Sequence, residues 1–405
     1  MTKIKGLIED ISGAIRVTKK REEAFKNAKD ENLYVDPINQ VARELHPAPF
    51  LAKVIKIEDV SITSRMFTFQ AVNNKLPIFQ AGNYVSIRVK IGNTITTRPY
   101  SISSAPYEAR GENGFFSITI RRGKDDTGFV SSYLYDHLKL QDTLEVEMPF
   151  GHFYFESLRD SKDIVGIAGG SGITPFYSMA KEIAHGTLDY NLTILYGSLS
   201  HMDIILEKEI DEIARKCDRV KVIHVLSDEN AKLNPQDLKG YISRDIIKKY
   251  SIDQDPKNGK TTYFICGPLP MYKYIKGELD SLNVPKRRIR MEVFGTDKDV
   301  SKIEGFPIEV KNEQYKITVV RGIKEDVIDA YANEPIIVAL ERHGILIRSL
   351  CRSGECGACR CKVLEGEFFI PKDVDYRRLA DKRFNYIHTC SCYPLSDMKI
   401  KITIL

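Results

Sequence analysis

The chain has 405 residues, a length that predicts two to four domains rather than one. Hydrophobic residues make up 42% and charged residues 28%, which excludes global disorder, and a net charge of +5 gives no indication of a nucleic-acid partner. No apolar run predicts a membrane span and no signal peptide opens the sequence, so we expect a soluble cytoplasmic protein.

Residues 1–48 are expected to form a helical extension. Apolar residues recur there at helical spacing, at Ile4, Leu7, Ile8, Ile11, Ala14 and Ile15. The prolines that follow His46 end any helix. Such an amphipathic face most often packs on the body of its own protein. The alternative is a helix that docks a partner or a membrane surface.

Residues 49–158 predict an antiparallel β-barrel. Short runs of alternating apolar and polar residues are separated by turn residues, as in such barrels. The expected strands are Val54–Ile57, Met66–Phe69, Tyr84–Val89, Phe116–Ile120 and Leu144–Met148. One helix is expected near residues 131–138.

Residues 159–295 predict an α/β domain of the doubly wound type. Buried strands at 163–168, 192–196, 220–225 and 262–266 alternate with helices, the first of which carries Pro175 in its first turn. This alternation indicates a parallel sheet with helices on both faces.

A polar linker is expected at residues 296–305, followed by a small α+β module of the β-grasp type at 306–405. The module is expected to open with a hairpin between Ile308–Val310 and Tyr315–Val320, and to close with a strand that starts at Met398.

Six of the eight cysteines lie within residues 351–405, which favours a metal site over a disulfide framework. Cys351, Cys356 and Cys359 have the C-x4-C-x2-C spacing that ligates a 2Fe–2S cluster together with a later cysteine. A zinc site is the alternative, but it usually needs a second C-x2-C pair. By position, Cys390 and Cys392 both qualify as the fourth ligand.

Three further motifs accompany these cysteines: Arg98-Pro99-Tyr100-Ser101, a glycine-rich turn at residues 166–175, and Cys266-Gly267-Pro268. With them, the chain resembles the ferredoxin–NADP⁺ reductase superfamily carrying a C-terminal plant-type ferredoxin domain. It is similar to reductase components of oxygenases and to hybrid-cluster-protein reductases. The resemblance leaves residues 1–48 without a counterpart.

The resemblance also selects the fourth cluster ligand. The ending Cys390-Ser-Cys392-Tyr-Pro394 is similar to the C-x-x-x-P of plant-type ferredoxins, which implies Cys390. Cys361 and Cys392 are then interpreted as small buried fillers.

For the flavin, the resemblance implies that Arg98 neutralises a phosphate, Tyr100 covers the ring and Ser101 hydrogen-bonds the redox-active N5. A diphosphate cradle is implied at the start of the next helix. Its residues are Ile120, Arg121, Gly128, Val130 and Ser131, with Pro99 completing the motif. This cradle favours FAD, with FMN as the alternative.

For the nicotinamide dinucleotide, the glycine-rich turn lets backbone amides approach a pyrophosphate. The expected binding residues are Gly169, Gly170, Gly172, Thr174, Gly267 and Pro268. The loop of residues 197–203 has no lysine or arginine, and its Asp203 would repel a 2′-phosphate. NADH is therefore predicted over NADPH.

Four residues are implied at the hydride path: Ser101, Cys266, Glu292 and Phe294. The role of Cys266 rests on the resemblance alone, because a cysteine after a strand is usually a buried filler. Glu292-Val-Phe294 resembles the E-x-F that ends the nicotinamide domain. Phe294 either lies over the flavin or is a core residue.

The expected function is that of an NADH-dependent oxidoreductase, an iron–sulfur flavoprotein reductase. It would pass electrons from NADH through FAD and a 2Fe–2S cluster to a partner redox protein or enzyme. One alternative is reverse flow from a reduced partner to NAD⁺. Another is a non-catalytic electron-transfer subunit of a larger complex, for which the N-terminal extension is the sequence feature.

Overall fold

The computed structural model describes residues 6–28, 37–72, 75–123, 128–253, 255–297 and 299–402. The chain divides into two units, Met1–Glu44 and Leu45–Leu405, and each is described by itself.

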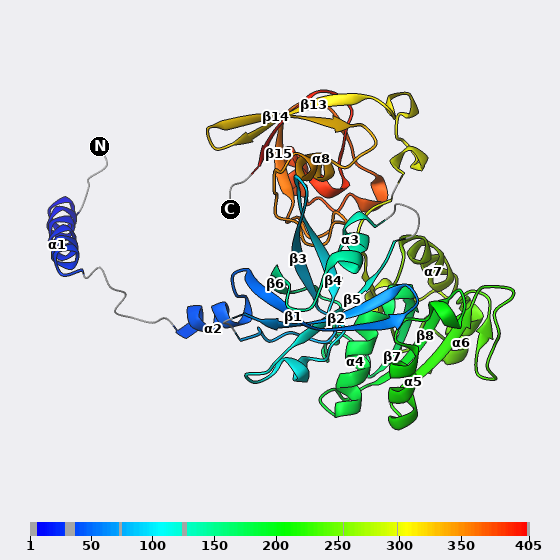
Figure 1. Ribbon diagram of the computed structural model, residues 1–405. Coiled ribbons are helices and arrows are strands. Elements are labelled where there is room, and N and C mark those ends of the chain that lie inside the picture. Colours follow the sequence, from blue (N-terminus) through cyan, green and yellow to red (C-terminus); the bar gives the residue numbers. More distant parts are fainter. Residues whose placement is uncertain are drawn as a thin grey trace. The chain divides into compact units, whose positions relative to one another are not determined.

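The first unit is helical (Figure 1). Helix α1 spans Leu7–Lys26 and α2 spans Pro37–Leu45, which confirms the predicted helical extension, while Ile4 lies outside the described residues. Ile11 and Ile15 are each 52% exposed. No helix in the described part of the chain is long and apolar enough to cross a membrane. The role of this segment stays a prediction.

The second unit begins with the predicted barrel. Among the described residues its strands pair antiparallel in the order β4-β3-β6-β1-β2-β5. A bridge between Ile102 and Ile118 joins the chain after β4 to β5, which closes the sheet. The alternating residues Phe67, Phe69 and Ile87 point into a core with no solvent exposure. The strands are β1 (Phe50–Ser61), β2 (Ser64–Ala71), β3 (Tyr84–Ile91), β4 (Thr94–Ser101), β5 (Phe116–Arg121) and β6 (Thr143–Phe150), and helix α3 spans Phe129–His137.

Strand β4 was absent from the sequence prediction, yet it contains the entire flavin motif. It lies at one end of the strand order and pairs with β3, so that Pro99 stands opposite Ser86. A proline is tolerated in such an edge strand because its missing N–H breaks no second ladder. Ile95 is the one apolar residue between Thr94 and Thr97, so the strand lacks the alternating apolar residues by which the others were predicted.

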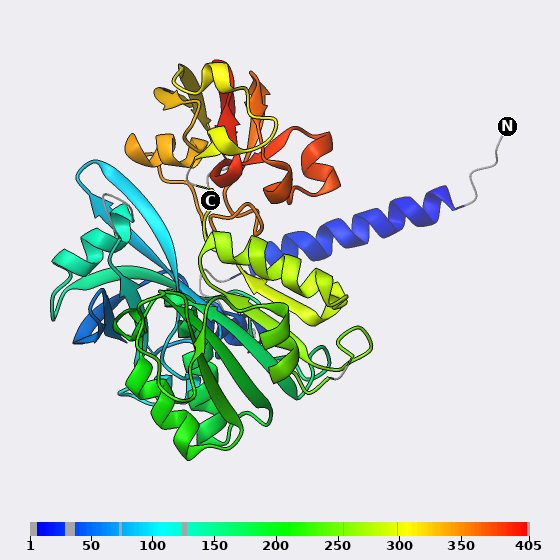
Figure 2. The ribbon, with the colours of Figure 1, turned by 90° about the vertical axis from the view of Figure 1, so that its right-hand side faces the viewer.

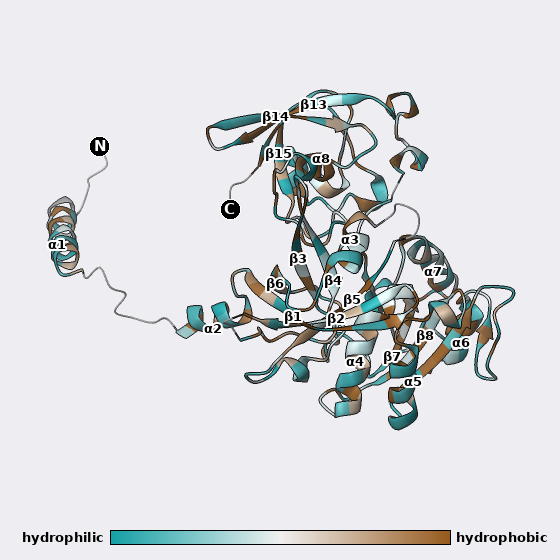
Figure 3. Cartoon of the chain, in the orientation of Figure 1, coloured by the Kyte–Doolittle hydropathy of each residue, from teal (hydrophilic) through white to brown (hydrophobic). Residues whose placement is uncertain are grey.

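The doubly wound α/β domain follows as predicted (Figure 1), with the parallel strand order β10-β9-β8-β7-β11-β12. Ile164 and Ala168 of β7 pack with α4 and α5, whereas Val165 and Ile167 pack with α6 and α7 on the opposite face. Figure 3 shows α5 as a largely hydrophilic helix. The elements are β7 (Asp163–Gly169), α4 (Thr174–His185), β8 (Asn191–Ser198), α5 (Glu207–Lys216), β9 (Val220–Leu226), β10 (Leu238–Lys239), α6 (Arg244–Tyr250), β11 (Thr262–Cys266), α7 (Leu269–Ser281) and β12 (Ile289–Glu292).

The C-terminal module is an α+β fold in which α8 packs on a mixed sheet of order β14-β13-β19-β15-β17 (Figure 1; Figure 2 after a quarter turn). Ile336, Ile337 and Leu340 of α8 are buried in its core. The elements are β13 (Gln314–Arg321), β14 (Lys324–Tyr331), α8 (Ile336–Arg342), β15 (Arg360–Glu365), β16 (Phe368–Phe369), α9 (Leu379–Arg383), β17 (Tyr386–His388), β18 (Tyr393–Pro394) and β19 (Met398–Ile402).

The hairpin predicted at the start of this module was wrong in one strand. Ile308–Val310 forms a single 3-10 turn, and the partner of β13 is β14, which follows it in the chain. The short turn Gly322-Ile323 connects β13 to β14. The charged run Lys324–Asp326 masked the second strand in the sequence pattern.

The predicted linker is partly packed. Val300 is fully buried and clusters with Phe306, Ala332 and Tyr393 of the C-terminal module. A burial of this kind joins the segment to the module rather than leaving it as a free tether.

Candidate active site

A cavity of about 820 Å³ lies between the barrel and the parallel sheet. Predicted site residues from both domains line it: Pro99, Tyr100, Ser101, Arg121, Ser131, Gly169, Gly170, Gly172, Thr174, Cys266, Gly267, Pro268 and Phe294. The described lining does not include Arg98, Ile120, Gly128, Val130 or Glu292. Ile120 and Val130 are buried in the barrel core, so their side chains do not face the cavity. Gly128 has a left-handed φ of 75° and precedes α3 as its N-cap residue.

On the barrel side of the cavity, two hydrogen bonds fix the flavin motif. The Tyr100 hydroxyl lies 3.1 Å from Ser131 Oγ at the start of α3. Ser101 Oγ donates to Glu292 Oε2 over 3.1 Å, which joins the end of β4 to the end of β12. The motif and the E-x-F segment, 191 residues apart, therefore meet at one wall.

On the other side, the glycine-rich turn runs from β7 into α4. A Cβ at Gly172 would lie 2.0 Å from the carbonyl oxygen of Cys266, and one at Gly169 would lie 2.4 Å from the sulfur of Met271. Only glycine lets these two turns approach each other so closely. The positive end of the α4 dipole, which this glycine-rich turn leads into, then favours an anion, as a pyrophosphate requires.

Burial governs the ionisation of two predicted catalytic residues. Burial is the main factor that raises the pKa of Glu292 to about 8, against the hydrogen bond from Ser101. The pKa of Cys266 is raised well above its usual value, also by burial, so this residue carries a neutral thiol. Phe294 is partly exposed and packs edge-on against Tyr84, with ring centroids 5.3 Å apart. Its place in the cavity lining disfavours a purely structural core role.

The four predicted cluster cysteines come together in the C-terminal module. The thiol groups of Cys351 and Cys356 contact each other, as do those of Cys359 and Cys390. Backbone amides of the loop point at the sulfurs: Gly354 N lies 3.2 Å from Cys390 Sγ and Cys356 N lies 3.3 Å from Cys351 Sγ. Gly354 and Gly357 have φ of 85° and 71°. This arrangement is the donor set that a 2Fe–2S cluster needs.

The remaining two cysteines of the module lie in its hydrophobic core. Cys361 and Cys392 have no solvent exposure and pack with Ile400 and Leu340. Burial raises the pKa of both thiols, which opposes a thiolate at either position.

Three family models match the chain in this same order. They describe an oxidoreductase FAD-binding domain at residues 51–155, an oxidoreductase NAD-binding domain at 167–277 and a 2Fe–2S iron–sulfur cluster binding domain at 323–395. NADH-cytochrome b5 reductase 1 of Dictyostelium discoideum is 30% identical over 62% of this chain and 84% of its own length. The chain belongs to the ferredoxin–NADP⁺ reductase superfamily. The chain is thus an oxidoreductase with FAD, NAD and 2Fe–2S domains, as predicted.

Other members of the superfamily extend the match over the C-terminal module. The glycine betaine monooxygenase reductase subunit of Chromohalobacter salexigens is 25% identical, over 86% of this chain and 94% of its own length. The structure of phthalate dioxygenase reductase shares the fold with a TM-score of 0.61, at 21% identity, over 88% of this chain and 98% of that one. The chain spans 60% of the flavohemoprotein of Oceanobacillus iheyensis, which it matches at 28% identity.

Arg98 has an acidic neighbour, Glu341, that the sequence analysis did not predict. Its Nη1 lies 3.7 Å from Glu341 Oε2, and the same carboxylate pairs with Arg352. Two guanidinium groups share one carboxylate, so the group has a net charge of +1, which fits the anionic phosphate predicted at Arg98. Burial and the charge of Arg352 lower the pKa of Arg98 to about 10, which still leaves it charged at neutral pH.

Tyr84 is a second residue that the sequence analysis missed. Its ring contacts Phe294, and its pKa is raised by burial first and then by the charges of Cys356, Cys351 and Glu292. The side chain thus lies within electrostatic reach of both the hydride wall and the cysteine loop. A tyrosine at the start of a barrel strand carries no sequence signal for such a position.

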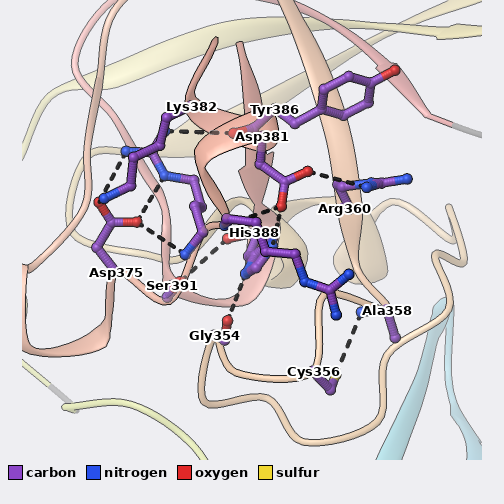
Figure 4. A network of polar contacts seen from close by, with 12 residues as sticks. Gly354, Cys356, Ala358, Arg360, Asp375, Asp381, Lys382, Tyr386, His388 and Ser391 are labelled. Atoms are coloured by element: carbon purple, nitrogen blue, oxygen red, sulfur yellow. Dashed lines mark hydrogen bonds and ion pairs between the residues drawn. The ribbon is translucent and has the colours of Figure 1, made fainter. Parts of the chain in front are cut away.

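His388 is a third such residue, and Figure 4 shows its side chain directed at Gly354 of the cysteine loop. Its Nδ1 lies 2.5 Å from the carbonyl oxygen of Gly354, so Nδ1 carries the proton and donates it. Its Nε2 lies 3.7 Å from Asp381 Oδ2, and Asp381 also binds Arg360. This chain of contacts fixes the loop that carries the cysteines.

Replacing Glu292 with glutamine is expected to increase the thermal stability of the cofactor-loaded protein, by more at pH 8 than at pH 5. The pKa of Glu292 is about 8 in the folded chain against an ordinary 4.5, so unfolding releases a proton between these values. Its contribution to stability therefore falls as pH rises through this window, by at most about 1.4 kcal/mol per pH unit. Melting temperatures of both proteins at pH 5, 6.5 and 8 measure the effect. A constant difference across that range would contradict the raised pKa.

Proposed function

We propose that this chain takes hydride from NADH at the cavity and delivers single electrons through its cysteine loop to an oxygenase partner. The observation that carries the proposal is the contact between the two sites. Gly295, next to Phe294 at the cavity wall, donates its N–H to the carbonyl oxygen of Cys351 over 3.5 Å. Electrons that enter at the cavity therefore have a short path to the cluster ligands.

Each side chain of the cavity has a role that follows from its position. The turn Gly169–Gly172 and the start of α4 bind the pyrophosphate of NADH through backbone amides. Thr174 and Cys266 border the place of the nicotinamide, where the neutral thiol of Cys266 supplies a small contact surface and no charge. Ser101 lines the cavity and donates its single hydroxyl proton to Glu292 Oε2, so rotation of this hydroxyl would redirect the proton to a bound flavin. Phe294 covers the wall between the cavity and Tyr84 and excludes water.

When bound, FAD would supply the conversion of a two-electron hydride donor into single electrons, and a 2Fe–2S cluster would supply a one-electron carrier. Arg98, Tyr100 and Ser101 are proposed to hold the flavin. Cys351, Cys356, Cys359 and Cys390 are proposed to hold the cluster, with loop amides directed at three of these sulfurs. Such hydrogen bonds to sulfur raise the reduction potential of a cluster.

An anaerobic titration of the purified protein with NADH tests this proposal. The expected result is loss of the flavin absorbance followed by the low-temperature EPR signal of a reduced 2Fe–2S cluster. A flavin that bleaches while the cluster stays oxidised and EPR-silent would contradict the forward route. It would instead favour electron flow from a reduced partner to NAD⁺.

The partner is proposed from the relatives, of which one is the reductase subunit of glycine betaine monooxygenase. Supplied with NADH, the protein should support turnover of an oxygenase component that has lost its own reductase. The test is coupled substrate oxidation, with NADH consumption measured beside it. NADH consumption that yields only peroxide would argue against an oxygenase partner.

Changing Asp203 to asparagine is expected to raise kcat/KM for NADPH relative to NADH by about fivefold, since removal of one nearby charge is worth about 1 kcal/mol. Asp203 lines the cavity beside Ser198, and its Oδ1 lies 3.5 Å from Arg121 Nη2. The substitution removes the carboxylate that would repel a 2′-phosphate and adds no new cation to the loop. Initial rates with both nucleotides give the ratio. An unchanged ratio would place the ribose 2′ position away from Asp203.

A further inference from the structure

The loop that carries the first cluster cysteine is attached to the flavin-motif strand by hydrogen bonds between buried groups. Thr97 Oγ1 of β4 lies 2.9 Å from the carbonyl oxygen of Ser349, to which it donates, and 2.8 Å from Ser349 Oγ. Arg352 Nη1 donates to the carbonyl oxygen of Thr97 over 3.2 Å. Thr97 directly precedes Arg98 and Ser349 lies two residues before Cys351, so this attachment joins the two cofactor motifs.

Glu341 of α8 is the anion at the centre of this attachment. Its Oε1 lies 2.6 Å from Arg352 Nη1 and its Oε2 lies 2.9 Å from Arg352 Nη2, a bidentate pair. The same Oε2 lies 3.7 Å from Arg98 Nη1. The Glu341 side chain is only 3% exposed and that of Arg352 9%, so water does not replace these contacts. Loss of one partner from such a pair leaves an uncompensated buried charge.

The backbone of Arg352 shows what the pair holds in place. This residue has a φ of 57°, in the left-handed region that non-glycine residues rarely occupy. A backbone of this kind persists only where surrounding contacts over-determine it. Arg352 follows Cys351 directly. The contacts of its side chain with Thr97 and Glu341 therefore set the position of the cysteine loop against β4 of the barrel.

We propose that Glu341 is a positioning residue for electron transfer between the flavin and the cluster. Through Arg352 and Arg98 it fixes the cysteine loop against β4, and so sets the spacing of the two cofactor sites. Among the described residues, the polar contacts of its side chain are to these two arginines and not to Ser101, Cys266, Glu292 or Phe294. This inference rests on the proposed function, because it concerns a step that exists only if electrons pass from the cavity to the cysteine loop.

The test compares Glu341→Gln with the wild type and with Glu334→Gln, all loaded with flavin and iron. Glu334 is a matched control, since it pairs with Arg342 over 2.5 Å in the same module and is 16% exposed. Stopped-flow absorbance under anaerobic conditions separates the phase in which NADH bleaches the flavin from the phase in which the cluster is reduced. For Glu341→Gln we expect an unchanged first phase and a second phase slowed about tenfold or more. Glu334→Gln should match the wild type in both phases.

Hydrogen exchange gives a readout that does not depend on turnover. In Glu341→Gln, the amides of β4 and of residues 347–353 should exchange faster, while those of β13 and β14 keep the wild-type rate. If both the second phase and these exchange rates equal the wild-type values, the inference is wrong. If the wild type itself never reduces its cluster, the proposed function fails instead.

Glu341→Asp keeps the inference testable if the glutamine variant fails to retain iron. Aspartate preserves the charge but is one methylene too short to bind both guanidinium nitrogens of Arg352 in the observed geometry. The expected second phase is slower than that of the wild type while the EPR signal of the cluster is unchanged. A wild-type second phase in Glu341→Asp would overturn the role of the bidentate pair.

Discussion

Serine in place of Cys390 is expected to abolish the visible and EPR signals of the 2Fe–2S cluster, or to shift them strongly, while NADH still bleaches the flavin. Cys390 Sγ contacts the Cys359 thiol group and lies 3.2 Å from the N–H of Gly354. A serine oxygen is a harder donor than a thiolate and suits iron–sulfur chemistry poorly. The loss in iron retention should exceed the roughly 10–100-fold typical of residues that only support a ligand.

Cys392→Ser is the matched control for that variant. Cys392 is two residues away, fully buried in the hydrophobic core, and burial raises the pKa of its thiol. Its serine variant should keep two irons per chain and the wild-type EPR signal, although it buries a hydroxyl and loses some stability. Iron content and EPR spectra of both variants give the answer. The reverse pattern, with signal lost only in Cys392→Ser, would reassign the fourth ligand.

Alanine in place of Gly172 is expected to reduce the rate at which NADH bleaches the flavin by about 100-fold or more, because displacing reacting groups by about 1 Å costs this much. The added Cβ would lie 2.0 Å from the carbonyl oxygen of Cys266 and 2.7 Å from Gly267 N. Both are backbone atoms, so neither turn relieves the clash by a rotamer change. The two turns must separate, and the nucleotide site opens.

Gly277→Ala provides the control for this second variant. Gly277 lies in α7 of the same domain, and its added Cβ meets nothing within 4 Å. Alanine there should leave the NADH reaction unchanged and stabilise the helix by about 0.5–1 kcal/mol. Single-turnover absorbance and thermal unfolding of the two variants separate the effects. Normal bleaching in Gly172→Ala would place the nucleotide outside this turn.

The sequence predicted those features of the protein that depend on residues close to one another in the chain. The spacing of Cys351, Cys356 and Cys359 follows from one loop wrapping one cluster, and the glycines of the β7–α4 turn follow from one close approach. The barrel and the parallel sheet followed from the periods of their apolar residues. In each case the residues that cooperate lie within a few positions of one another.

Contacts between distant segments could not be predicted in this way. Glu341 meets Arg98 across 243 positions of the chain, and nothing near either residue marks the pairing. The same holds for Tyr84 and for His388, which act on loops that the sequence places far away. Strand β14 was not predicted for a different reason. Its exposed charged residues obscure the pattern of its buried apolar residues Ile328 and Ala330.

The shared carboxylate of Glu341 also limits how the modules of such reductases can be exchanged. A ferredoxin module grafted from a relative onto this barrel would bring its own residue to the position of Glu341, while Thr97 and Arg98 remain with the host. A chimera joined only at residues 296–305 would then fold and bind both cofactors, but its electron transfer from the flavin to the cluster would be slow. Transplanting α8, the cysteine loop and β4 together is expected to preserve the rate of electron transfer. These three segments, rather than the module boundaries, should therefore be exchanged as one unit.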